Sequence, residues 1–199
     1  MTENKGLKTG TTTVGLVTKD SVVLAADTRA SMGHLAYDEE VNKIHQITDN
    51  VALTIAGSVG DALALVRHLR SHAKLFEIER ETKITPKAIA TYVSNILNSN
   101  RFYPFMVQFI IGGINTKPEM FDVDPSGGLL ERKQFAVTGS GTELAMAVLD
   151  QNYKEGMTTE QGIELVKKAV NAAKKRDIYS GGIAVNILVI DKNGTREIK

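Results

Sequence analysis

The sequence contains no cysteine, which excludes disulfide bonds, thiol catalysis and cysteine-ligated metal sites. It also has no apolar run long enough to cross a membrane as a helix. Neither sign of charge is in excess, because 24 Lys and Arg side chains are balanced by 23 Asp and Glu side chains. Such a chain has no general electrostatic attraction to nucleic acid or to an anionic membrane. We therefore expect neither a nucleic-acid nor a membrane partner, and no residue pattern calls for a metal or a cofactor.

The composition is that of one folded domain. A hydrophobic content of 42% in 199 residues is sufficient for a well-buried core. The first ten residues contain two lysines, a glutamate and few apolar side chains, so they lack the hydrophobic core of a signal peptide. The absence of cysteine fits a reducing compartment. We expect a soluble, cytoplasmic protein with a single domain over residues 11–199.

The first half of the chain alternates between strand-like and helix-like patterns. Residues 12–17 and 21–27 are apolar runs around a polar turn, which predicts a β-hairpin. Residues 51–56 form another apolar strand, which ends at GSVG and leads into a helix. A second helix begins at Thr85-Pro86, where a capping residue precedes proline at the first helical position.

The second half repeats this order. Strands separated by proline and glycine are expected at residues 107–115, 120–123 and 135–137. The segment FAVTGSGTELAMAVL then has the layout of LTIAGSVGDALALV, an apolar strand, a glycine-serine break and a helix. Another helix begins at Thr158, with Gln161 placed to complete a capping box. Residues 183–190 form a long apolar strand, and a short strand ends the chain. Hairpin links favour two antiparallel sheets covered by helix pairs over a parallel sheet, so we predict an α+β fold, a four-layer αββα sandwich.

The dipeptide Gly10-Thr11 lies just before the first predicted strand. If the bond between them is cut, Thr11 becomes an amino terminus whose amine titrates near pH ~8 and can act as the base for its own hydroxyl. Before the cut, the amide nitrogen cannot take that proton, so residues 1–10 would form a propeptide that keeps the nucleophile inactive. A Gly-Thr step is also ordinary at a turn entering a strand, and alone it leaves both interpretations open.

Two charged residues are candidate partners of this threonine. Asp27 ends an apolar strand in VLAADTRASMG, where a carboxylate can also simply cap a turn. Lys43 lies in EVNKIHQI, a segment of strand-like character, where it is either solvated or buried against a carboxylate. Beside a threonine amino terminus, an ammonium group would favour deprotonation of the hydroxyl and the amine. Asp27 would then offset the cost of burying Lys43.

Six motifs occur in order along the chain: GTTTVG, AADTRAS, EVNKIHQI, TIAGSVGD, VTGSGTELA and RDIYSGG. On these motifs the chain resembles the beta subunits of archaeal proteasomes over essentially its whole length. The resemblance implies the four-layer fold of N-terminal nucleophile hydrolases and a threonine endopeptidase that removes its own propeptide by cutting between Gly10 and Thr11. It also implies that Thr11 is the nucleophile and that Asp27 and Lys43 tune it.

The resemblance implies further site residues. Ser140, Asp177 and Ser180 would orient the Thr11 amine and a proton-carrying water. From the residues alone, Ser140 could instead cap the following helix and Asp177 could end the preceding one. Gly57 would donate its backbone amide to the oxyanion.

The implied substrate is an unfolded polypeptide, bound as an added strand through main-chain hydrogen bonds to residues 31–33 and 57–59. The side chains that would contact it are Ala30, Ser31, Val41, His45, Ile55, Val59 and Leu63. This mostly aliphatic set predicts a preference for apolar residues before the cut. His45 is the exception, and its role stays open between a pocket rim, a core histidine and a pH sensor. Ser31 stands where many active relatives have threonine.

The resemblance also implies an assembly. Seven copies of this chain would form a ring, and two such rings would stack between rings of proteasome alpha subunits, with the active sites facing an enclosed chamber. A regulatory ATPase would act indirectly, through the alpha rings. Whether a beta paralogue joins the ring is left open by the sequence.

Other functions are less well matched. A structural subunit that relies on an active paralogue would not need the set Thr11, Asp27, Lys43 and Ser140. Nucleotide binding at the GSVGD or GSGTE turns lacks the following Lys-Ser or Lys-Thr and does not match a dinucleotide fingerprint. His68 and His72 lie four apart on a predicted helix, but the HLRSH stretch has no glutamate to act as a base. The bacterial two-ring peptidase of related fold fits AADTRAS and RDIYSGG less well.

Overall fold

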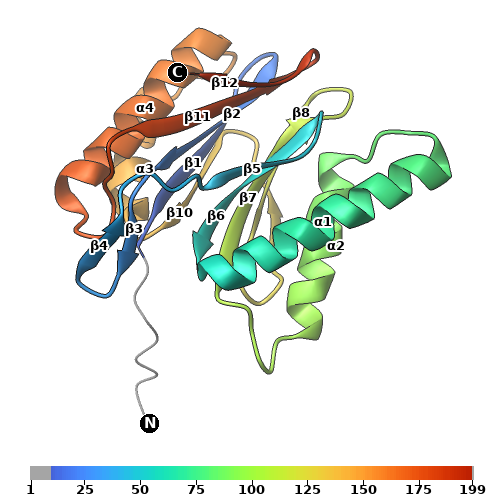
Figure 1. The fold of residues 1–199 in the computed structure, drawn as a ribbon. Coiled ribbons are helices and arrows are strands. Elements are labelled where there is room, and N and C mark those ends of the chain that lie inside the picture. Colours follow the sequence, from blue (N-terminus) through green and yellow to red (C-terminus); the bar gives the residue numbers. More distant parts are fainter. Residues whose placement is uncertain (1–9, 199) are drawn as a thin grey trace.

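Two five-stranded antiparallel sheets form the centre of the computed structural model, which describes residues 10–198 (Figure 1). The first sheet has the order β10-β1-β2-β11-β12, formed by Phe135–Gly139, Thr12–Val17, Ser21–Asp27, Val185–Asp191 and Gly194–Ile198. The second has the order β5-β6-β7-β8-β9, formed by Ile44–Thr48, Val51–Gly57, Val107–Ile114, Pro118–Val123 and Leu129–Glu131. A separate hairpin consists of β3, Ala30–Met32, and β4, Leu35–Asp38.

Four helices cover the outer faces of the two sheets. Helices α1, Val59–Arg80, and α2, Pro86–Ser99, pack on the sheet that contains β6 and β7 (Figure 1). Helices α3, Thr142–Asn152, and α4, Thr159–Arg176, pack on the sheet that contains β1 and β2. A third apolar cluster fills the space between the sheets. The predicted α+β, four-layer αββα sandwich is confirmed.

Strand β2 shows why the sandwich needs continuous apolar runs rather than alternating ones. All seven of its residues are buried. Val23 and Ala25 belong to the cluster beneath α3 and α4, while Val22 and Leu24 belong to the cluster between the sheets. Because both faces are covered, each buried valine or leucine contributes about 1.5–3 kcal/mol. The same packing holds the end of β2, and with it Asp27, in place.

The helix starts follow the predicted capping chemistry. Thr85 caps α2 by accepting a hydrogen bond from the Ala88 amide, and proline occupies the first turn. Thr158 and Gln161 form both halves of a capping box at the start of α4. Within residues 10–198, no helix is long and apolar enough to span a membrane.

Three short strands have no counterpart in the sequence prediction. These are β3, β4 and β9, and all four residues of β4 are exposed. Their three or four residues are too few to show an alternating pattern, so a sequence pattern does not separate them from a loop. The last long strand was expected over residues 183–190, but β11 begins at Val185 and Ile183 is 71% exposed. That part of the prediction is wrong because Ile183 packs into no apolar cluster of the described residues.

Candidate active site

Thr11 lies immediately before β1, where neighbouring strands of the first sheet meet. Thr12 pairs with Gly139 of β10, and Thr13 pairs with Ala26 of β2. Because β1 is hydrogen-bonded on both sides, two strands fix the position of Thr11. The residue is buried, with 7% of its surface exposed.

The polar atoms of Thr11 are all engaged. Its hydroxyl donates to the carbonyl oxygen of Gly10, with 2.6 Å between the oxygens. Its backbone amide donates to Ser140 Oγ at 3.2 Å. The Ser140 hydroxyl donates to Asp177 Oδ2 at 2.6 Å and lies 3.3 Å from the Thr11 carbonyl oxygen. Ser140 therefore connects the nitrogen that would become the free amine to a carboxylate.

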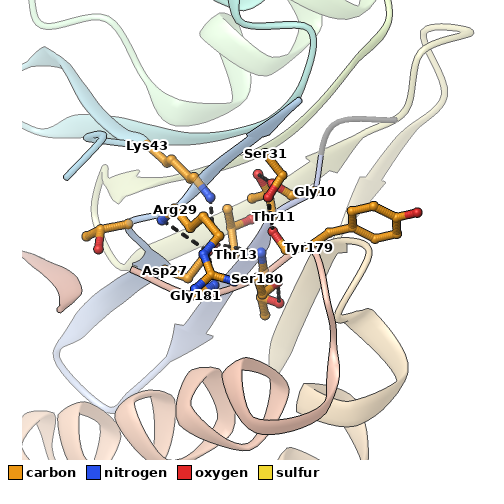
Figure 2. Close-up of polar contacts among 12 residues, drawn as sticks. Gly10, Thr11, Thr13, Asp27, Arg29, Ser31, Lys43, Tyr179, Ser180 and Gly181 are labelled. Atoms are coloured by element: carbon orange, nitrogen blue, oxygen red, sulfur yellow. Dashed lines mark hydrogen bonds and ion pairs between the residues drawn. The ribbon is translucent and has the colours of Figure 1, made fainter. Parts of the chain in front are cut away.

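A buried ion pair lies beside the threonine (Figure 2). Lys43 Nζ donates to Asp27 Oδ1 at 2.7 Å, and the two residues are 3% and 0% exposed. The backbone amides of Thr12 and Gly181 also donate to the Asp27 carboxylate, at 2.9 and 2.8 Å. These hydrogen bonds offset the cost of removing the carboxylate from water. Burial lowers the pKa of Lys43, while the charge of Asp27 and its hydrogen bond act in the opposite direction.

Asp177 joins two parts of the site. It ends α4, where its backbone amide donates to the Ala173 carbonyl oxygen at 2.8 Å. Its carboxylate accepts hydrogen bonds from Ser140 and Ser180, each at 2.6 Å. The Ser180 oxygen also lies 2.7 Å from the Thr12 hydroxyl oxygen. The helix-ending role and the contacts with both serines therefore occur together in Asp177.

Ser140 does not cap the helix that follows it. The residue preceding α3 in the capping position is Gly141, which makes no side-chain capping bond. The capping alternative for Ser140 is therefore wrong, because its hydroxyl is directed to Thr11 and Asp177 instead.

A small cavity brings most of the predicted substrate residues together with the threonine. It is lined by Gly10, Thr11, Ala30, Ser31, Val41, Lys43, Ile55, Gly57 and Val59. Its walls away from Thr11 and Lys43 are mainly aliphatic, as the sequence suggested. The functional roles of these residues stay predictions.

Two predicted substrate residues do not line this cavity. Leu63 is partly buried on α1. His45 pairs with Leu53 across β5 and β6, and Leu53 belongs to the cluster beneath α1 and α2. The Nε2 atom of His45 is hidden from solvent and has no hydrogen-bond partner among the described residues. Burial lowers the pKa of His45, and the positive charge of Arg70 lowers it further.

Gly57 ends β6 in a conformation that favours glycine. Its φ is +108°, and a Cβ atom there would overlap the carbonyl oxygen of Met106. Both constraints exclude a side chain. The following residue, Ser58, caps α1 by accepting a hydrogen bond from the Asp61 amide. The proposed oxyanion role of the Gly57 amide stays a prediction.

The comparisons with known proteins agree with this arrangement. A family model described as proteasome subunit matches residues 7–190. The chain belongs to the proteasome subunit family. Its two sheets and four helices have the arrangement of the N-terminal nucleophile hydrolase fold.

Individual proteasome subunits are similar over nearly the whole chain. The proteasome subunit beta of Methanocaldococcus fervens is 49% identical over 189 residues, covering 94% of this chain and 84% of that protein. Proteasome subunit beta 1 of Pyrococcus furiosus is 47% identical over 190 residues, 96% of each chain. Proteasome subunit beta 2 of Thermococcus gammatolerans is 47% identical over 190 residues, 96% of this chain and 94% of that one. The predicted resemblance to archaeal proteasome beta subunits is confirmed.

Several residues of this proteasome-family site escaped the sequence analysis. The Thr12 hydroxyl contacts Ser180, the Gly181 amide contacts Asp27, and the Tyr179 carbonyl oxygen accepts a hydrogen bond from Ser31 at 2.9 Å. The motif RDIYSGG contains two of them. Its sequence carries no signal for which backbone atoms face the site, because that depends on the end of α4 meeting β2.

The paired histidines of α1 have a structural explanation. His72 stacks on the Tyr92 ring of α2 with 3.7 Å between ring centroids, and His68 Nε2 lies 2.9 Å from the Tyr92 hydroxyl oxygen. Both histidines therefore contribute to the contact between α1 and α2. In the described part of the chain, no three metal-binding side chains cluster.

Proposed function

We propose that this chain is a catalytic beta subunit of the proteasome core and that Thr11 is the nucleophile of a threonine endopeptidase. The observation that best supports the proposal is the convergence on one cavity of Thr11, the Lys43 of a buried ion pair and an aliphatic wall. Family membership alone would fit an inactive subunit equally well. A buried, hydrogen-bonded Lys-Asp pair beside a threonine suits nucleophilic catalysis better than stability, because buried ion pairs add little net stability.

The first reaction is removal of the propeptide, residues 1–10, of which residues 1–9 lie outside the described structure. Thr11 Oγ1 adds to the carbonyl carbon of Gly10, and the bond from that carbon to the Thr11 nitrogen breaks. The nitrogen takes the proton released by the hydroxyl. Water then hydrolyses the ester, which leaves a carboxylate on Gly10 and a free hydroxyl and amine on Thr11. The 2.6 Å contact between Thr11 Oγ1 and the Gly10 carbonyl oxygen supports this step.

The second reaction uses the same hydroxyl on a bound polypeptide. The freed amine of Thr11, held by Ser140, accepts the hydroxyl proton while Oγ1 attacks the substrate carbonyl carbon. The Lys43 ammonium favours the deprotonated hydroxyl, and Asp27 holds that ammonium in place. The amine then gives its proton to the leaving peptide nitrogen, and water releases the acyl group from Oγ1. Asp177 holds Ser140 in position, and Ser180 contacts Thr12 at the start of β1.

Substrate binding follows from the cavity and the adjoining backbone. The Gly57 amide holds the oxyanion, and the polypeptide lies extended against residues 31–33 and 57–59. Main-chain recognition predicts broad specificity. Aliphatic side chains at Val41, Ile55 and Val59 predict a preference for apolar residues before the cut.

The mature domain, residues 11–199, would act within an assembly in the cytoplasm. We propose seven-membered rings of this chain stacked in pairs between rings of alpha subunits, with unfolded substrates admitted through those rings under the control of an ATPase. The similarity to proteins named proteasome subunit beta supports this arrangement.

The decisive measurement is the intact mass of the chain after assembly with its alpha partner. The parent should lose residues 1–10, and Thr11→Ala should retain them and show no peptide hydrolysis, since the attacking oxygen is gone. Thr48→Ala is the matched control, because Thr48 lies on β5 outside the cavity. Leader removal in Thr11→Ala would show that Thr11 is not the nucleophile.

One alternative is a ring subunit that is poorly active without a beta paralogue. Thermococcus gammatolerans has a proteasome subunit beta 1 and a beta 2, which are 45% and 47% identical to this chain. If the parent chain keeps its leader with the alpha partner and loses it only when a paralogue is added, this alternative holds.

A further inference from the structure

Gly10, the residue before the proposed self-cleavage, is pressed against Tyr179. A Cβ atom placed on Gly10 would overlap the Cβ of Tyr179 and would lie 2.7 Å from its Cα and 2.8 Å from its Cγ. Real Cβ atoms essentially never approach other heavy atoms within 3.0 Å. No side chain fits at position 10 while the chain has this path. The atoms that exclude it all belong to Tyr179.

Tyr179 cannot easily move away, because hydrogen bonds hold its backbone on both sides. Its amide donates to Asp177 Oδ1 at 3.2 Å, and its carbonyl oxygen accepts from Ser31 Oγ at 2.9 Å. The next two residues are also fixed, since Ser180 bonds to Asp177 and the Gly181 amide bonds to the buried Asp27. The obstacle is therefore part of the same network that surrounds the nucleophile.

The tyrosine ring is not the main obstacle. Figure 2 shows the ring directed away from the ion pair of Asp27 and Lys43, with Gly10 lying beside the Tyr179 backbone. The closest atom to the missing side chain is the Tyr179 Cβ, which every residue except glycine would also supply. The steric rule is thus set by the first atom of the side chain at position 179.

We propose that Tyr179 is a specificity-determining residue for propeptide removal, which restricts the residue before the self-cleaved bond to glycine. This inference rests on the proposed function. The close contact of Thr11 Oγ1 with the Gly10 carbonyl oxygen occurs in the same chain path that leaves no room for a Cβ beside Tyr179. A residue with a Cβ at position 10 must move away from Tyr179, and its carbonyl group then moves away from the Thr11 hydroxyl.

The rule applies to the chain's own leader and not to separate substrates. The leader is covalently joined to Thr11, so its last residue must lie beside Tyr179. A separate polypeptide has no such link and can place its side chain in the aliphatic cavity near Val41 and Ile55. The same nucleophile therefore requires glycine before the cleaved bond in the leader and prefers an apolar residue before the cleaved bond in a substrate.

The test follows leader removal by intact mass during assembly of the full chain with its alpha partner. Gly10→Ala should slow removal about 10- to 100-fold, which corresponds to about 1.4–2.7 kcal/mol in the barrier and lies within the usual cost of overpacking. Adding Tyr179→Gly to this variant should restore removal in part, because the Tyr179 Cα remains close. Adding Tyr179→Ala is the matched control and should restore nothing, since it keeps the Cβ.

Each outcome has one meaning. Normal removal in Gly10→Ala, or equal rates in the two double variants, would overturn the inference. Each double variant is compared with its own Tyr179 single variant, so that any effect of position 179 on the reaction itself cancels. If the parent itself keeps its leader, the proposed function fails instead. Once its leader is off, the parent should still cut peptides with leucine before the cut, which a glycine rule for substrates would forbid.

Discussion

The two turns that lead from strand to helix, GSVGD at the end of β6 and GSGTE at the end of β10, begin with the same glycine-serine pair but use the serine differently. Both begin with a glycine at positive φ, +108° at Gly57 and +95° at Gly139, and a Cβ on either would overlap a carbonyl oxygen. The serines then differ. Ser58 caps its helix, whereas Ser140 leaves its helix without a side-chain cap and contacts Thr11 and Asp177.

The local sequence therefore specifies the turn, whereas the neighbouring segments of the chain specify the serine's hydrogen-bond partner. Ser58 has the Asp61 amide within its own helix to bond, at 3.4 Å. Ser140 lies one residue before the capping position of α3, which Gly141 occupies, and it lies beside β1. Its hydroxyl therefore contacts the Thr11 amide and makes a charge-assisted hydrogen bond to Asp177.

The largest effect is expected from Gly139→Ala, because the carbonyl oxygen that its Cβ would overlap belongs to Thr11. We expect a loss of about 2–5 kcal/mol in the free energy of unfolding from strain and overpacking, together with loss of propeptide removal. Thermal unfolding and intact mass measure the two effects. Gly156→Ala is the control, since Gly156 has a φ of +74° and open space around it. Equal losses in the two variants would show that backbone strain alone is responsible.

An intermediate effect separates the two serines. Ser140→Ala should lower peptide hydrolysis by about 10- to 100-fold, because the Thr11 amine loses its oriented partner, while the folded state loses little. Ser58→Ala should instead cost about 1 kcal/mol in the free energy of unfolding, the usual value of a helix cap. Steady-state kinetics and thermal unfolding of both variants provide the comparison. A larger stability loss in Ser140→Ala than in Ser58→Ala would contradict the division of roles.

The sequence predicts the fold wherever burial on both sides leaves an apolar run or a cap is explicit. The bounds of β1 and β2 and the starts of α2 and α4 are of this kind. It predicts poorly where three-dimensional contacts decide. The exposed strand β4 is too short for a strand pattern. The partner of Ser140 is Thr11, which lies 129 positions away in sequence.

The two halves of the sandwich also differ in how their polar groups are satisfied, and His45 provides the smallest effect. The groups around Thr11 are hydrogen-bonded, whereas the buried Nε2 of His45 beneath α1 has no partner among the described residues. Burial lowers the pKa of His45, so at mildly acidic pH the unfolded chain binds more protons than the folded chain. Stability should therefore be full above about pH 6.5 and should decline as the pH falls toward the lowered pKa of the folded state.

His45→Gln removes this titration and should reduce the difference in thermal stability between about pH 7.5 and pH 5.5. The test compares thermal unfolding of the parent and the variant at both pH values. His34→Gln changes an exposed histidine and should keep the parent's difference. If His45→Gln also keeps it, the lowered pKa has no effect on stability, and His45 is a spectator in the half of the molecule that does not hold the nucleophile. If the difference shrinks only in His45→Gln, burial of the His45 ring lowers the free energy of unfolding at acidic pH. That loss then arises in the half of the molecule beneath α1 and not around Thr11.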